Sequence, residues 1–171
     1  MNSKQIVAAV SVVVLVIMLA YPALSTGTVL NTLASAKIAN ADHVYVTVGN
    51  VWIHHAGHSQ SDGWELVSNQ TQTVDLVALA NNTMSLPKAQ IPVGGYDNVR
   101  MELTNVTWAF NKTTTRLSVE STQLQARLQF TIQAGGEVTI TMMIGGHQEQ
   151  IQGSKFFIST FNATLSGAPV P

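Results

Sequence analysis

The chain of 171 residues contains no cysteine and few charged residues. The absence of cysteine excludes a disulfide scaffold, a thiolate zinc site, an iron–sulfur cluster and a cysteine nucleophile. Only 10% of the residues are charged, whereas about a quarter are charged in an ordinary soluble domain. The 8 basic and 9 acidic residues nearly cancel, so the chain lacks the electrostatic footprint of a nucleic-acid-binding protein. Hydrophobic residues make up 46% of the chain, which is enough for a core and excludes a disordered protein.

The sequence motifs of common enzymes are also missing. The chain has no Gly-x-Ser-x-Gly, no His-Glu-x-x-His, no phosphate-binding loop and no dinucleotide fingerprint. Its acidic residues are scattered singly, so no local pair of carboxylates indicates acid and base catalysis. We therefore expect no enzymatic activity, no cofactor and no nucleic-acid partner.

Residues 1–25 predict an export signal. Lys4 precedes an apolar run over residues 6–20, and the small residues Ala23 and Ser25 stand before the expected cleavage point. A positive, then apolar, then small-residue layout is that of a secretory signal helix. We expect cleavage after Ser25, an extracellular or cell-surface mature chain, and contact with the membrane only through the signal segment before cleavage.

Two alternatives for this segment stay open. The apolar run is close to the minimum length of a membrane span, so it is also consistent with an uncleaved anchor. A type IV pilin-like subunit, cleaved near Gln5, would instead keep the apolar segment as its N-terminal helix.

Hydrophobic residues alternate along several segments after residue 40, with the period of two that is typical of strands. In residues 124–132 the apolar side chains lie on one face and the polar ones on the other. Residues 137–144 repeat this pattern, and Ala134-Gly135-Gly136 between the two segments predicts a hairpin turn. Gly145-Gly146 predicts the next turn.

Two further segments alternate with irregularities. Residues 43–54 carry apolar side chains on both faces, which predicts a central strand buried on both sides for part of its length. The alternation over residues 99–110 changes phase at Asn105, which predicts a bulge. Shorter strands are expected over residues 64–68, 73–78, 114–119 and 156–165. Together these segments predict an all-β fold, an antiparallel, immunoglobulin-like or pilin-like β-sandwich of seven to nine strands.

The segment over residues 26–41 fits this pattern less well. Its apolar residues follow neither a clean alternation nor a helical stripe, and residues 34–41 are small and polar like a linker. We expect three parts: a signal peptide over residues 1–25, an N-terminal strand with its linker over 26–41, and a β-sandwich domain over 42–171.

Several landmarks resemble a family of uncharacterised secreted prokaryotic β-sandwich domains. The resemblance begins with Val44-Tyr45-Val46-Thr47-Val48 and Trp52-Ile53-His54, and continues through Gly63-Trp64, Val74-Asp75-Leu76, Leu86, Ile91-Pro92-Val93-Gly94-Gly95-Tyr96 and Val99-Arg100-Met101. The family usually has acidic residues late in the chain, near residues 137–144. Thr139 and Thr141 stand there in this sequence, so an acidic metal site is not carried over.

The layout of the chain is also similar to that of the archaeal thread pilins. The shared features are a signal peptide, a loosely patterned N-terminal segment, a sandwich domain and glycosylation sequons. In that family, glycosylated surface filaments form because the N-terminal strand of each subunit completes the sandwich of its neighbour. The resemblance implies the same assembly here, with copies of the chain as partners.

Two kinds of modification or ligand site are considered. Five Asn-x-Ser/Thr sequons predict N-linked glycans, at Asn69, Asn81, Asn105, Asn111 and Asn162. His54, His55 and His58, with Asp62 nearby, form the one metal-like cluster. Consecutive strand residues face opposite sides and Gly57 disfavours a helix, so His54 and His58 are weak metal candidates and we expect a polar loop tip instead.

Three residues are expected to have structural roles. Asp75 lies between Val74 and Leu76, and a carboxylate buried in a strand needs a partner, for which Arg100 is the candidate. Tyr96 follows two glycines at the start of a strand, where a corner tyrosine would donate to upstream backbone.

The leading hypothesis is a structural subunit of an extracellular filament, with a role in adhesion or biofilm. A sandwich that lacks a strand exposes an apolar groove and unpaired backbone, and a strand from a second copy can fill both needs. We expect residues 27–35 to be donated, residues 36–41 to connect, and Val29, Leu30 and Leu33 to enter the groove. The alternative is a monomeric or membrane-anchored ligand-binding or carbohydrate-binding sandwich, with stacking by Trp52, Trp64 or Trp108.

Overall fold

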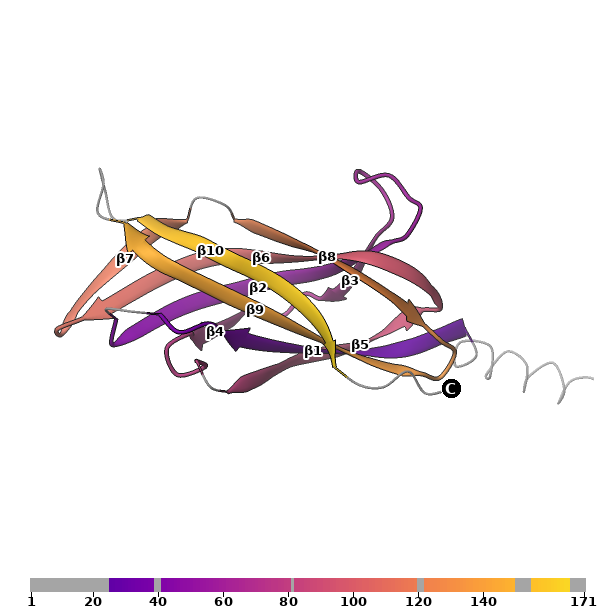
Figure 1. Cartoon of the computed structure of the whole chain (residues 1–171), viewed down its shortest axis with the longest axis horizontal. Helices are drawn as coiled ribbons and strands as arrows, with labels where there is room; N and C mark the ends of the chain where they lie inside the picture. Colours follow the sequence, from indigo (N-terminus) through magenta and orange to yellow (C-terminus); the bar gives the residue numbers. More distant parts are fainter. Residues whose placement is uncertain (1–24, 39–40, 81, 120–121, 150–154, 167–171) are drawn as a thin grey trace, which may run out of the picture.

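The computed structural model describes residues 25–38, 41–80, 82–119, 122–149 and 155–166. These residues form ten strands in two layers (Figure 1), so the predicted sandwich is confirmed while the predicted number of strands is too low. The predicted signal helix lies outside the described residues. Within the described ranges, no apolar helix reaches the length that a membrane span requires.

Sheet A is built mainly from strands at the two ends of the chain. Its order is β5 (Thr83–Pro92), β1 (Thr26–Ser35), β9 (Glu137–Glu149) and β10 (Lys155–Ser166). Strand β1 runs antiparallel to β5 but parallel to β9. The sheet is therefore mixed, and the expectation of a purely antiparallel sandwich is wrong.

Sheet B contains the middle of the chain. Strand β2 (His43–His55) pairs with β6 (Gly94–Phe110) on one side and with the short strands β3 (Trp64–Ser68) and β4 (Gln72–Asp75) on the other. Strand β6 also pairs with β7 (Thr113–Val119) and β8 (Gln123–Ile132). A two-residue parallel pairing between β7 and β10 joins the two sheets.

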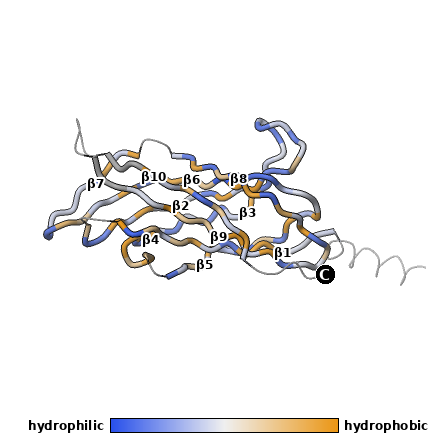
Figure 2. The backbone as a smooth tube through the Cα atoms, in the orientation of Figure 1, coloured by the Kyte–Doolittle hydropathy of each residue, from blue (hydrophilic) through white to orange (hydrophobic). Residues whose placement is uncertain are grey.

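The core lies between the sheets, and shifts in the β2–β6 register help to decide which residues enter it. The bulge expected at Asn105 is confirmed by a shift in the β2–β6 register. A second shift between Val48 and Val51 reverses the alternation of β2, so both of its apolar rows face the same core. The expectation that this strand is buried by apolar layers on both sides is therefore wrong. Hydrophobic residues gather along the paired strands, whereas the β2–β3 loop is mostly hydrophilic (Figure 2).

The connection between β8 and β9 differs from its expectation. Strand β8 belongs to sheet B and β9 to sheet A, so Ala134-Gly135-Gly136 crosses between the layers and does not form a hairpin. Gly145 and Gly146 lie inside β9 and do not end it. Alternation marks strands of either sheet alike, so it could not assign these two segments to different layers.

Candidate functional site

Strand β1 pairs with a different strand on each of its two edges, antiparallel with β5 and parallel with β9. It stands between β5 and β9 as an interior strand of sheet A, and Figure 1 shows it beside β5. We call the space between β5 and β9, which β1 occupies, the β1 slot. Here the strand belongs to the same chain as the slot, so the structure records an intramolecular pairing.

One row of β1 side chains points into the core. The residues of this row are buried, and they are Gly27, Val29, Asn31, Leu33 and Ser35. Leu30 lies on the opposite face and is half-buried, so its expected insertion is wrong because strand geometry separates it from its neighbours. The row alternates cleanly, but its glycine, asparagine and serine concealed the pattern in the sequence.

The N-terminal end of β1 is held by backbone hydrogen bonds to two turns. The N–H of Val93 donates to the carbonyl of Ser25 at 2.9 Å, and the N–H of Gly135 donates to that of Thr26 at 2.9 Å. The N–H of Thr28 donates to the carbonyl of Gly136 at 2.8 Å. These bonds fix the position at which β1 enters sheet A.

Gly27 occupies a tight place below the same turn. A Cβ atom at this position would lie 2.6 Å from the carbonyl oxygen of Gln133, 2.6 Å from Cγ2 of Ile132 and 3.0 Å from the carbonyl oxygen of Gly136. Two of these three atoms are backbone, which cannot rotate away as a flexible side chain can. The mouth of the β1 slot therefore accepts glycine only.

Asn31 places an amide in the middle of the buried row. Only 1% of its surface is exposed. Its Nδ2 donates a long 3.4 Å hydrogen bond to the carbonyl of Pro87, and its Oδ1 is buried without a partner. Pro87 lies where the β1–β5 register shifts between Val29 and Asn31. The amide thus meets the one irregular place in the β5 wall of the slot.

At the end of sheet B where β2 leads into β3, His54 holds the β2–β3 loop. Its Nδ1 lies 2.8 Å from Oδ1 of Asp97, and its Nε2 lies 2.9 Å from the carbonyl oxygen of Ser59. Both partners are acceptors, so both ring nitrogens carry a proton and the imidazole is positively charged. We call His54, Asp97 and Ser59 the loop clamp.

The electrostatics of the loop clamp agree with this protonation. Burial lowers the pKa of His54, but the hydrogen bonds to Ser59 and Asp97 outweigh burial and raise this pKa above 6.5. Burial also raises the pKa of Asp97, but the hydrogen bonds from His54 and Asn98 outweigh it and lower this pKa below 3.8. The pair is therefore ionised between these two ordinary pKa values, at mildly acidic pH.

His54 and His58, the weak metal candidates, do not share a site among the described residues. No group of three or more His, Asp and Glu side chains is placed there to hold an ion. The nitrogens of His54 are occupied by Asp97 and Ser59, while the ring of His58 lies 5.7 Å from that of His55. His54 and His58 thus have separate environments.

The expected pair between Asp75 and Arg100 is wrong. Oδ2 of Asp75 lies 2.7 Å from Nδ1 of His43, and its Oδ1 accepts from the N–H groups of Val44 and Val77. Burial raises the pKa of Asp75, but these hydrogen bonds outweigh it and lower the pKa below 3.8. In the β2–β4 ladder Asp75 pairs with Tyr45, and His43 lies on β2 two residues before Tyr45, on the same face of the strand.

Arg100 stacks between two tryptophans on the outer face of sheet B. Its guanidinium carbon lies 3.9 Å from the ring centroid of Trp64 and 4.9 Å from that of Trp52. The third tryptophan, Trp108, is buried in the core. Arg100 therefore occupies one face of Trp52 and one face of Trp64.

Tyr96 lies at the corner between β5 and β6. Its hydroxyl donates to the carbonyl of Pro92, four residues upstream, at 2.9 Å. Burial, followed by the negative charge of Glu65, raises the pKa of Tyr96 to about 12. Its ring stacks on Phe130 at 5.3 Å between centroids. These contacts fix the corner beside the mouth of the β1 slot.

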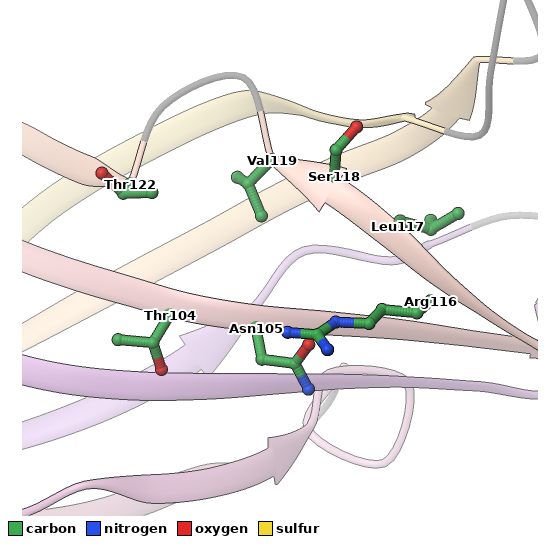
Figure 3. Close-up of a pocket in the computed structure, with 7 residues that line it drawn as sticks. All are labelled: Thr104, Asn105, Arg116, Leu117, Ser118, Val119 and Thr122. Atoms are coloured by element: carbon green, nitrogen blue, oxygen red, sulfur yellow. The ribbon is translucent and has the colours of Figure 1, made fainter.

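The sequon asparagines have different surroundings. Asn69 and Asn111 are exposed in connections between strands, and Asn162 is exposed on β10. Asn81 lies outside the described residues. Asn105 is half-buried on β6, in a hollow of about 420 Å³ where its amide lies beside the guanidinium of Arg116 (Figure 3), and its Oδ1 is buried without a partner. A glycan on Asn105 therefore has less room than on the three exposed sites.

The chain matches a protein-family model described as "Domain of unknown function (DUF4382)" over residues 26–157. The match begins at the first residue of β1 and includes nine of the strands in full. The chain therefore belongs to this family, and β1 is part of the family domain. A comparison with curated proteins gives no match.

Proposed function

We propose that the chain is a structural subunit of an extracellular filament, in which β1 of one copy fills the β1 slot of the next. The observation that carries this proposal is the place of β1. It is the first strand of the family domain, yet it is an interior strand of sheet A, between two strands from distant parts of the chain. If the export signal is removed after Ser25, β1 begins the mature chain and can pair with its own sheet or with another copy.

The contacts support exchange between copies. The inward row buries Val29 and Leu33 completely, and both edges of β1 pair with neighbouring backbone. If β1 left its slot, sheet A would expose an apolar groove and two unpaired strand edges. A second copy offers the same β1, so its insertion restores the same contacts. Such a head-to-tail contact need not close and therefore produces filaments.

The exposed sequons on the protein surface are consistent with an extracellular location. The sequons at Asn69, Asn111 and Asn162 place their acceptors in solvent, where N-linked glycans can extend without displacing the core. We include these glycans, an export signal over residues 1–25 and the absence of catalysis in the proposal. The resemblance in layout to archaeal thread pilins supports the same assignment.

The second candidate is a monomeric or membrane-anchored ligand-binding sandwich. It is favoured by one observation, the pairing of β1 with strands of its own chain. Against it, Arg100 occupies one face of Trp52 and one face of Trp64, which leaves less surface for stacking on a sugar. The type IV pilin alternative concerns residues outside the described ranges.

Engineered cysteines can separate the two candidates, because the natural chain has none. Thr32 on β1 and Thr141 on β9 face each other, with their Oγ1 atoms 2.8 Å apart. Two full-length variants, Thr32→Cys and Thr141→Cys, are mixed under mild oxidation. Exchange of β1 gives a disulfide-linked heterodimer on a non-reducing gel, and the double variant gives a ladder of covalent polymers.

A matched control uses Thr47→Cys in place of Thr141→Cys, because Thr47 lies on β2 in the other sheet. This variant should give no heterodimer above random collision. If the mixture of Thr32→Cys and Thr141→Cys stays monomeric, and the double variant closes only within one chain, the filament proposal fails and the monomeric candidate stands.

A further inference from the structure

The β1 slot is built to recognise a particular strand in a particular register. Two residues of the inward row, Gly27 and Asn31, have surroundings that no other position of the slot repeats. We infer that these two residues set the register of β1 and restrict the slot to strands of this sequence, so that its partner is a second copy of this chain. The identity of the partner rests on the proposed function, whereas the control of register does not.

Gly27 limits sliding in both directions. A strand can keep its inward face only if it slides by two residues, since a slip of one turns every side chain over. A slip of two brings either Ser25 or Val29 below the turn that covers Gly27. Both carry a Cβ atom, which would lie 2.6 Å from the carbonyl oxygen of Gln133. Steric contact with backbone thus opposes each slipped register.

Asn31 opposes the same slips by its polarity. In the observed register its Nδ2 reaches the carbonyl of Pro87, at the irregular place in β5. In a slipped register the amide would face the regular part of the wall, and a buried amide without any partner is costly. Buried asparagines fix the register of coiled coils by this principle. Asn31 therefore selects the register in which Pro87 is opposite.

Together these residues define what the slot accepts. The strand must present glycine at its mouth, an apolar side chain two residues later, an amide after two more, and an apolar side chain after a further two. Residues 27–33 of this chain carry that row as Gly27, Val29, Asn31 and Leu33. An arbitrary apolar strand, with a Cβ at the first position and no amide at the third, would meet a clash and leave the carbonyl of Pro87 without Nδ2.

Disulfide trapping within one full-length chain measures the register directly. Thr32→Cys is combined in turn with a cysteine at Thr139, Thr141 or Met143, which face Leu30, Thr32 and Ala34 in the parallel β1–β9 ladder. In the otherwise natural chain, only the pair of positions 32 and 141 should close. This measurement needs no exchange between copies, so its failure is distinct from failure of the filament proposal.

The decisive variant moves the glycine of position 27 and the asparagine of position 31 two residues towards the N-terminus. It carries Ser25→Gly, Gly27→Val, Val29→Asn and Asn31→Val. If Gly27 and Asn31 set the register, β1 slides by two residues, position 32 faces position 143, and that disulfide replaces the pair of positions 32 and 141. A matched control exchanges two outward residues, Thr28→Leu with Leu30→Thr, and should keep the natural pair. If the shifted variant also keeps the natural pair, the inference is overturned.

A single substitution provides a second measurement should the shifted variant fail to fold. Gly27→Ala introduces the clash at the mouth, and we expect hydrogen-exchange protection of the Thr28 N–H to fall by about tenfold or more. The control is Gly95→Ala, because a Cβ there meets only the Cβ of Ala56 at 3.7 Å. Equal protection of the Thr28 N–H in the two variants would also overturn the inference.

Discussion

Asn31 in the β1 slot and Asn98 near the loop clamp are both buried asparagines, with 1% and 7% of their surfaces exposed. Asn98 donates to Oδ1 of Asp97 at 2.8 Å and accepts from Nε2 of Gln125 at 3.2 Å. Asn31 makes one long bond at 3.4 Å and leaves Oδ1 unpaired. The same side chain is satisfied in one region and poorly satisfied in the other.

This difference shows that different interactions stabilise the β2–β3 loop and strand β1. The loop clamp gathers a charged pair, a carbonyl and an amide into a connected network, which fixes the β2–β3 loop in one arrangement. In the β1 slot, backbone pairing and the apolar contacts of Val29 and Leu33 hold the strand, while Asn31 adds selectivity at some loss of stability. Such a slot can bind β1 selectively and can also release it, so that β1 of a second copy takes its place, as the filament proposal requires.

The largest loss of folding stability is expected from a substitution in the loop clamp. Asp97→Ala leaves the buried imidazole of His54 without its charged acceptor, and hydrogen bonds to charged groups are worth about 1.5–3 kcal/mol. We expect the free energy of unfolding in urea to fall by about 2 kcal/mol. The control Glu137→Ala removes an exposed carboxylate and should change it by less than about 0.5 kcal/mol. Equal effects of the two variants would show that the clamp does not stabilise the fold.

The effect of Asp97→Ala should also depend on pH. The raised pKa of His54 means that its contribution is complete below about 6.5 and is lost as the pH rises through the folded-state value. The lowered pKa of Asp97 means that its contribution is complete above about 3.8 and is lost as the pH falls through its folded-state value. The stability difference from the natural chain should therefore be greatest near pH 5 and smaller at acidic and alkaline extremes. A difference that is constant with pH contradicts the ionised pair.

Substitutions of Asn98 and Asn31 should change folding stability by different amounts. Asn98→Ala removes two hydrogen bonds and leaves Asp97 and Gln125 each with one partner fewer, so we expect a loss of about 1–2 kcal/mol. Asn31→Val removes an unpaired buried oxygen for the loss of one long bond, so we expect no loss or a gain of up to about 1 kcal/mol. Thermal unfolding of both variants checks the comparison. If Asn31→Val proves as destabilising as Asn98→Ala, the two regions do not differ as described.

The sequence predicted the strands of sheet B well because their alternation is regular between a few local shifts in register. It did not predict β5, whose prolines Pro87 and Pro92 argue against a strand, although an edge strand tolerates them. The alternation of β1 was hidden because three of its five inward residues are glycine, asparagine and serine. Gly27 and Asn31, which we infer to make the slot selective, are also two of the residues that hid the alternation of β1 in the sequence.

The candidate site could be predicted only where one strand decides it. Val29, Leu30 and Leu33 were all expected to enter the groove of a second copy, and the alternation of β1 places only Val29 and Leu33 in the buried row. The environment of Asn31 depends on Pro87, 56 residues away. Likewise the partner of Asp75 follows from the β2–β4 pairing, which places His43 next to it. Pairing between strands is set by the whole sheet, and local spacing in one sequence does not contain it.

The smallest loss of stability is expected at Arg100, which tests the comparison because its Nε is also buried without a partner. Its guanidinium is instead held against Trp64 and Trp52. Arg100→Lys keeps the charge but loses the planar group that stacks on both rings, so we expect a loss of about 0.5–1 kcal/mol and a change in tryptophan fluorescence. The control Arg127→Lys lies on the exposed face of β8 and should change neither. A neutral result at Arg100 would mean that its unpaired Nε offsets the stacking, and the loop end would then resemble the β1 slot more closely.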